Sequence, residues 1–184
     1  IKVIGGFHKF PIKKTSLFLG NAGTAFRPLV AILSILGGSY DLKGVPRMHE
    51  RPIKDLVDAL LSIGADIKYL GQSGYPPLKI SKSNILINGP IYINGNVSSQ
   101  YLTALLIAAP LANQSLSIQI DGDLISKPYI DITLKLLEKF DIFYINKDWQ
   151  SFKLKTPASF KSPKEVFVEG DASSASYFFA AGAI

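Results

Sequence analysis

Hydrophobic residues recur along the chain with two spacings, which predict a mixture of helices and strands. Apolar residues three and four positions apart predict amphipathic helices over residues 52–62 and 128–139. Alanine-rich apolar runs predict two further helices over residues 22–36 and 97–109. Short β-branched and aromatic runs predict strands, which lie near residues 17–19, 40–43, 66–70, 78–80, 91–93, 115–120, 142–145, 152–155 and 166–168.

A short string of small and polar residues occurs three times at a constant interval. It begins at Gly20 (GNAGTA), Gly95 (GNVSSQ) and Gly170 (GDASSA), so that successive copies are 75 residues apart. Each copy follows a predicted strand and precedes an apolar run. The interval defines a βαβαββ unit that is present about two and a half times. It predicts an α/β (α+β) fold with sheets outside and helices inside.

The start of each repeated helix is suited to binding an anion. Asn or Asp of the string is expected to cap the helix. The small residues Gly23, Thr24, Ser98 and Ser99 leave its first backbone N–H groups uncrowded. Because these N–H groups and the helix dipole attract negative charge, stacked units would bring several anion sites to one face. For any single string, ordinary capping and close packing of small residues is the alternative.

Composition excludes several classes of chemistry. Of the 184 residues, 47% are hydrophobic and 18% are charged, which is typical of a globular protein. There is no cysteine, which excludes disulfides, thiolate metal sites and cysteine nucleophiles. His8 and His49 lack metal-ligand spacing, and no apolar stretch is long enough to span a bilayer. We therefore expect a soluble, cytoplasmic protein without a metal.

The basic residues point to three positions of interest. The net charge is +6, yet only three of the 20 basic residues are arginines, namely Arg27, Arg47 and Arg51. Arginine grips a carboxylate or phosphate with two N–H groups, which lysine cannot do. Glu50 is expected to pair with one of its two neighbouring arginines and to leave the other free for an anion. Surface ion pairing is the alternative for each arginine, and the scattered lysines do not resemble a nucleic-acid-binding surface.

The ends of the sequence indicate a piece of a longer polypeptide. Residue 1 is isoleucine, and residues 174–184 (SASYFFAAGAI) form an apolar run of helical character without a cap. A processed mature chain is the alternative.

The repeated strings and the arginine loop together resemble the 5-enolpyruvylshikimate-3-phosphate synthase (EPSP synthase) family of 3-phosphoshikimate 1-carboxyvinyltransferases. Five segments carry the resemblance: residues 17–29 (LFLGNAGTAFRPL), 44–60 (GVPRMHERPIKDLVDAL), 95–112 (GNVSSQYLTALLIAAPLA), 122–134 (GDLISKPYIDITL) and 168–178 (VEGDASSASYF). It covers nearly the whole chain. Phe26 stands where the family has methionine, and Val45 and His49 are further departures in the arginine loop.

The resemblance implies a fold and a division into domains. Members of the family have two globular halves, each built of three βαβαββ units, which form an inside-out α/β barrel with a double crossover. Residues 1–168 would be most of the half that binds shikimate 3-phosphate, without its N-terminal segment. Residues 169–184 would be the crossover and the first helix of the second half.

The resemblance also implies residues that bind shikimate 3-phosphate. Ser98, Ser99 and Ser126 resemble the hydroxyls that hold its phosphate group. Tyr129 resembles the aromatic residue against its ring, and Gln100 resembles a contact to the ring that also reaches phosphoenolpyruvate.

A second group of residues resembles the phosphoenolpyruvate site. Arg51 matches the arginine that grips this ligand, and Gly23 marks where the ligand comes closest to the backbone. Asn21 and Thr24 shape the same turn, and Gln100 is shared with the first group. By the same resemblance, Arg27 is structural and electrostatic, while we interpret Arg47 as structural.

The implied reaction transfers the enolpyruvyl group of phosphoenolpyruvate to the 5-hydroxyl of shikimate 3-phosphate, in the biosynthesis of chorismate and aromatic amino acids. In the family the acid and base groups come from parts outside this chain, so no catalytic residue is expected in it. No metal or organic cofactor is implied. The chain is expected to bind substrate without turnover, with the missing second half as its partner. No nucleic-acid or membrane partner is implied, and the full-length protein is expected to be a monomer.

Two other functions stay open. An enzyme that enolpyruvylates a UDP-sugar should lack the NAGTA…R pattern of residues 21–27, which is present. A binding module for phosphate ligands, with no chemistry of its own, would bind the same ligands without releasing phosphate.

Overall fold

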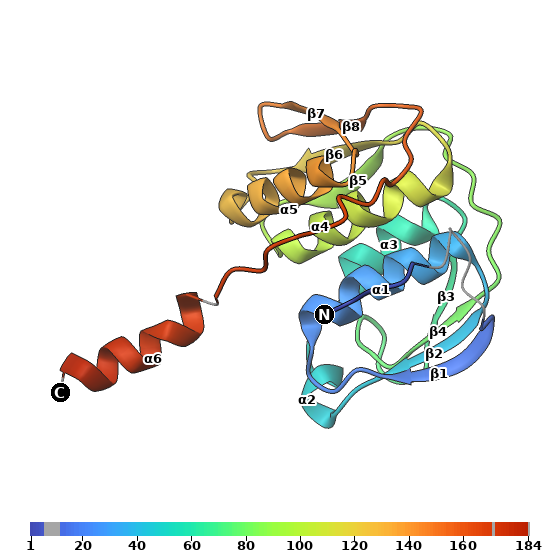
Figure 1. Ribbon diagram of the computed structural model, residues 1–184. Helices are drawn as coiled ribbons and strands as arrows, with labels where there is room; N and C mark the ends of the chain where they lie inside the picture. Colours follow the sequence, from blue (N-terminus) through green and yellow to red (C-terminus); the bar gives the residue numbers. More distant parts are fainter. Residues whose placement is uncertain (6–11, 171, 184) are drawn as a thin grey trace.

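Two four-stranded mixed sheets of the same topology flank a layer of helices in the computed structural model (Figure 1), which describes residues 1–5, 12–170 and 172–183. Across the first sheet the order is β1 (Lys14–Phe18), β2 (Ser39–Lys43), β4 (Leu78–Ser81) and β3 (Asp66–Tyr69). Across the second it is β5 (Ile91–Asn94), β6 (Ser117–Asp121), β8 (Ser151–Leu154) and β7 (Tyr144–Lys147). In both sheets the first two strands are parallel and the other pairs antiparallel.

The helices connect the strands in the same order in both units. They are α1 (Gly23–Leu36), α2 (Pro46–His49), α3 (Lys54–Leu61), α4 (Ser99–Ala108), α5 (Lys127–Lys139) and α6 (Ala172–Ala183), with the 3₁₀ helix η1 (Ala109–Ala112) after α4. Because parallel neighbours need a crossover connection, α1 joins β1 to β2 and α4 joins β5 to β6. The predicted βαβαββ order is therefore confirmed for two units.

One face of each sheet is buried against the helices. Burial alternates along the strands, so that Tyr40 and Leu42 of β2 and Ile91 and Ile93 of β5 point inward. The facing helices α1 and α4 run side by side between the sheets (Figure 1). A single core extends through both units, which confirms the predicted arrangement of sheets outside and helices inside.

The predicted strand over residues 166–168 is wrong. This segment has no regular secondary structure, and the side chains of Phe167 and Val168 are exposed. A strand is stable only when a neighbouring strand pairs with its backbone groups. Within the described part of the chain, no strand pairs with this segment, so its β-type composition alone does not produce one.

The predicted capping of the repeated helices by Asn is also wrong. The residue before α1 is Ala22, which makes no side-chain capping bond, and the residue before α4 is Ser98, whose hydroxyl accepts a hydrogen bond from the Gln100 N–H at 3.3 Å. Asn21 lies one position further out, where its carbonyl accepts from the Gly23 N–H at 3.0 Å. Asp171 of the third string lies outside the described residues.

Helix α6 projects away from the rest of the molecule (Figure 1). Its aromatic residues Tyr177, Phe178 and Phe179 are exposed. In the described part of the chain, no helix combines the length and the apolar character that crossing a membrane requires.

Candidate active site

The starts of α1 and α4 meet at the junction between the two units. The Arg27 side chain, in the second turn of α1, donates from Nη1 to Oε1 of Gln100, the second residue of α4, at 2.6 Å. The two residues are 73 positions apart in the sequence. This bond brings the starts of α1 and α4 together, as predicted for the first two copies of the string, whereas α6 of the third copy projects away from them (Figure 1).

Gly23 lies directly beneath two guanidinium groups. A Cβ atom at this position would lie 2.7 Å from Nη2 of Arg51 and would also collide with Nη1 of Arg27. Arg51 donates from Nη1 to the carbonyl of Asn21 at 3.1 Å, which holds it against the turn that precedes α1. Only glycine allows both arginines to approach this helix start so closely, because any side chain would occupy the position of their N–H groups.

Arg27 is unusually buried for an arginine, with 7% of its surface exposed. Its guanidinium carbon lies 5.6 Å from the centre of the Tyr101 ring, and its Nε has no hydrogen-bond partner in the described structure. Burial lowers the pKa of Arg27; Tyr101 opposes this shift, while the nearby charge of Arg51 adds to it. Arginine nevertheless stays protonated at neutral pH. Two like charges close together favour an anion between them.

The arginine loop separates the roles of Arg47 and Arg51. Arg47 pairs with Glu50 at 2.5 Å on the surface, which confirms that Glu50 takes one of the two arginines. Helix α2 ends at His49, so the two arginines do not share a helical face. In residues 1–5, 12–170 and 172–183, no carboxylate lies within ion-pair distance of Arg51. Arg51 is therefore available to bind an anionic ligand.

The predicted phosphate-binding hydroxyls lie at the second helix start. Ser98 caps α4, Ser99 is its first residue, and Ser126 precedes α5. The loop before Ser126 is attached to the turn before α4, because the Ile125 N–H donates to the Gly95 carbonyl at 3.1 Å. Ser126 has a left-handed backbone (φ 57°), a conformation that is costly outside glycine and that clusters at binding sites.

Two further site residues are placed less closely. Tyr129 lies in the first turn of α5, with its side chain mostly exposed. Thr24 is the second residue of α1, directly after Gly23. Within the described residues neither side chain makes a hydrogen bond, so both are placed by their helix starts alone.

Sequence reasoning missed Tyr101 as part of this site. Its hydroxyl donates to the Pro52 carbonyl at 2.7 Å, and Arg27 Nη2 donates to the same carbonyl at 3.4 Å. An aromatic residue in an alanine-rich helix is ordinarily core, and Tyr101 is indeed 1% exposed. The polar contact of its hydroxyl depends on the position of the other unit, which a local pattern does not contain.

This arrangement suits binding of an anion better than acid–base chemistry. It offers fixed positive charge, helix N-termini and hydroxyl donors. Asp58 of α3 pairs with Lys54 on the surface, away from these groups. In the described residues no group of His, Asp and Glu is arranged to hold a metal ion.

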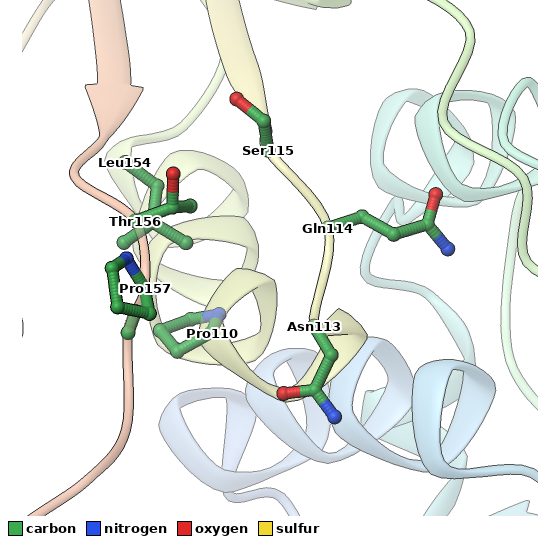
Figure 2. Close-up of a pocket in the computed structure, with 8 residues that line it drawn as sticks. Pro110, Asn113, Gln114, Ser115, Leu154, Thr156 and Pro157 are labelled. Atoms are coloured by element: carbon green, nitrogen blue, oxygen red, sulfur yellow. The ribbon is translucent and has the colours of Figure 1, made fainter.

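A cavity of about 390 Å³ lies elsewhere, after the C-terminal end of α4 (Figure 2). Pro110, Asn113, Thr156 and Pro157 are among its lining residues, and none of the residues around it is charged. It lacks the cations that an anionic substrate requires, so volume alone does not identify the site.

Comparison with known proteins gives consistent results. The EPSP synthase (3-phosphoshikimate 1-carboxyvinyltransferase) family model matches residues 1–184. The chain is 58% identical to the 3-phosphoshikimate 1-carboxyvinyltransferase of Neisseria meningitidis serogroup B over all of this chain and 42% of that protein. It is 55% identical to that of Bordetella parapertussis over 98% of this chain and 42% of that protein. The chain therefore spans less than half the length of these curated relatives.

The fold is also similar to a solved structure. EPSP synthase from Acinetobacter baumannii superposes with a TM-score of 0.69 and 21% identity, over 85% of this chain and 34% of that chain. The likeness extends the agreement from sequence to fold.

Proposed function

Because the chain belongs to the EPSP synthase family, we propose that the full-length protein transfers the enolpyruvyl group of phosphoenolpyruvate to the 5-hydroxyl of shikimate 3-phosphate. The products are 5-enolpyruvylshikimate 3-phosphate and phosphate, on the route to chorismate and aromatic amino acids. The observation that carries the proposal is the pair of guanidinium groups over Gly23, where the starts of α1 and α4 meet.

Phosphoenolpyruvate binds at the first helix start. Arg51 supplies two N–H groups to the ligand, since it has no carboxylate partner in the described residues. Gly23 lets the guanidinium groups that meet the ligand approach the helix start, and Asn21 and Thr24 shape the turn. Gln100 donates from its amide nitrogen, because its oxygen already accepts from Arg27.

Shikimate 3-phosphate binds at the second helix start. The hydroxyls of Ser98, Ser99 and Ser126 donate to its phosphate, assisted by the dipole of α4. Tyr129 lies against the ring, and Gln100 contacts both substrates. The position of Ser126 directly before α5, on a loop attached to the turn before α4, supports this assignment.

The positive charge in the site stabilises the reaction intermediate and does not itself transfer protons. The 5-hydroxyl gives up its proton and attacks C2 of phosphoenolpyruvate while C3 takes up a proton, so that a tetrahedral intermediate with a methyl group forms. Loss of a proton from this methyl group then breaks the bond from C2 to the phosphate oxygen, which releases phosphate and restores the double bond. Fixed guanidinium and N–H donors stabilise the charges of this intermediate. The acid and base that move the protons belong to parts of the protein outside this chain, and no cofactor is needed.

The division into residues 1–168 and 169–184 is part of the proposal. Residues 1–168 form most of one half of the family's inside-out barrel, and α6 begins the other half. The separation of α6 from the sheets supports this division (Figure 1). On α5, Ile132 and Leu136 are 62% and 44% exposed, which supports a further unit of the first half covering this helix. The full-length protein is proposed to be a monomer.

The chain of residues 1–184 is expected to bind shikimate 3-phosphate without turning it over. The hydroxyls and the α4 N-terminus are present, whereas the acid and base groups are not. Calorimetry should detect binding of shikimate 3-phosphate, and a phosphate-release assay with both substrates should give no signal above background. Turnover by this chain alone would show that the acid and base lie within it. If the full-length protein also released no phosphate, the result would favour a binding module.

In the full-length protein, Gly23→Ala is expected to exclude glyphosate, a bulkier analogue of phosphoenolpyruvate, more than phosphoenolpyruvate itself. The new methyl group displaces the guanidinium of Arg51, which a Cβ would approach to 2.7 Å. Overpacking of this kind costs about 1–3 kcal/mol. The loss of binding free energy should be greater for the larger ligand.

The measurement is the inhibition constant for glyphosate beside the KM for phosphoenolpyruvate. Gly89→Ala is the matched control, because a Cβ there meets no atom within 4 Å. Equal losses for both ligands would mean that Gly23 serves helix packing only.

A further inference from the structure

The Pro52 carbonyl is held by side chains of α1 and α4. Pro52 follows Arg51 and lies just before α3, whose first backbone bond runs from the Val57 N–H to the Ile53 carbonyl at 3.1 Å. The carbonyl therefore accepts instead from the Tyr101 hydroxyl at 2.7 Å and from Nη2 of Arg27 at 3.4 Å. The shorter of these two bonds is the one to Tyr101.

Tyr101 reaches this carbonyl from the other βαβαββ unit. It is the third residue of α4, 49 positions away from Pro52 in the sequence. Its ring is 1% exposed and lies beneath the guanidinium of Arg27, with 5.6 Å from the ring centre to the guanidinium carbon. A ring packed on all sides keeps one rotamer, so its hydroxyl is a fixed point from which the Pro52 peptide is held.

We propose that Tyr101 is a positioning residue for phosphoenolpyruvate. Its hydroxyl fixes the peptide that follows Arg51, and its ring supports Arg27, so one side chain sets the height of both guanidinium groups over Gly23. This proposal rests on the proposed function. It also means that α4, which Ser98 caps and Ser99 begins, connects the shikimate 3-phosphate end of the site to Arg51.

Tyr101→Phe in the full-length protein tests this role, because it removes the hydroxyl and keeps the ring. Tyr144→Phe is the matched control: the Tyr144 hydroxyl donates to the Leu106 carbonyl at 2.8 Å, seven residues further along α4 than Ser99. Each variant loses one hydrogen bond from a tyrosine hydroxyl to a backbone carbonyl, and the two bonds are similar in length. The readouts are kcat and KM for each substrate, and calorimetry of phosphoenolpyruvate binding in each variant.

We expect Tyr101→Phe to raise the KM for phosphoenolpyruvate about tenfold, which corresponds to the loss of one hydrogen bond to a buried group. The KM for shikimate 3-phosphate should stay within about twofold, and Tyr144→Phe should change neither value. Equal KM values for the two variants, a parallel rise for both substrates, or failure of Tyr101→Phe to fold would overturn the positioning role. If instead the unaltered full-length protein does not use these substrates, the proposed function itself is wrong.

Discussion

Arg51→Gln in the full-length protein should raise the KM for phosphoenolpyruvate by about a hundredfold or more. A hydrogen bond to a charged group contributes roughly 1.5–3 kcal/mol, and Arg51 is placed to make two of them. Glutamine keeps a donor but loses the charge and the forked geometry. Arg51→Lys should recover only part of the loss, since lysine keeps the charge but not the fork.

The same loop supplies the control for this substitution. Arg47 lies four residues earlier, is exposed and pairs with Glu50. A surface ion pair contributes about 0–1 kcal/mol, so Arg47→Gln should leave both KM values and the melting temperature almost unchanged. Steady-state kinetics of the three variants decide the matter. If Arg47→Gln is as damaging as Arg51→Gln, the loss belongs to the loop and not to a contact with the ligand.

The double substitution Ser98→Ala with Ser99→Ala should weaken binding of shikimate 3-phosphate by about two orders of magnitude or more. Each hydroxyl is expected to donate to the phosphate, and a hydrogen bond to a charged group is worth about 1.5–3 kcal/mol. Calorimetry of the full-length protein with shikimate 3-phosphate measures the effect directly. Unchanged affinity would contradict the phosphate role of both residues.

Ser98 also caps α4, so loss of stability must be separated from loss of binding. The Ser98 hydroxyl accepts from the Gln100 N–H, and losing such a cap costs about 1 kcal/mol of stability. Ser98→Asp is the informative companion, because aspartate is an equally good cap and repels phosphate. It should fold like the unaltered protein, with the same melting temperature, and still lose shikimate 3-phosphate.

The fold was largely predictable because its signals are local or periodic. The apolar spacing of α3 and α5 and the 75-residue interval between Gly20 and Gly95 together predict two βαβαββ units with sheets outside. The two wrong predictions have separate reasons. The run at residues 166–168 has strand composition but no described strand to pair with, and Asn21 lies one residue outside the capping position of α1.

The candidate site was predictable only in part, because several of its contacts join residues of the two different units. Scarcity of arginine singled out Arg27 and Arg51, and the position of Glu50 correctly indicated that one loop arginine would be paired. The hydrogen bond from Arg27 to Gln100 joins residues 73 positions apart, and the bond from Tyr101 to Pro52 joins residues 49 positions apart. Neither follows from a local pattern, since each depends on how α1 and α4 pack.

The central claim is that the starts of α1 and α4 together form one site for two anionic substrates. A crystal structure of the full-length protein with shikimate 3-phosphate and glyphosate tests it most directly. We predict the phosphate of shikimate 3-phosphate at the hydroxyls of Ser98, Ser99 and Ser126, and the second ligand beside Gly23, in contact with the guanidinium of Arg51. Ligands bound elsewhere, for example in the uncharged cavity beside Pro110, or an Arg51 turned away from both, would contradict the account.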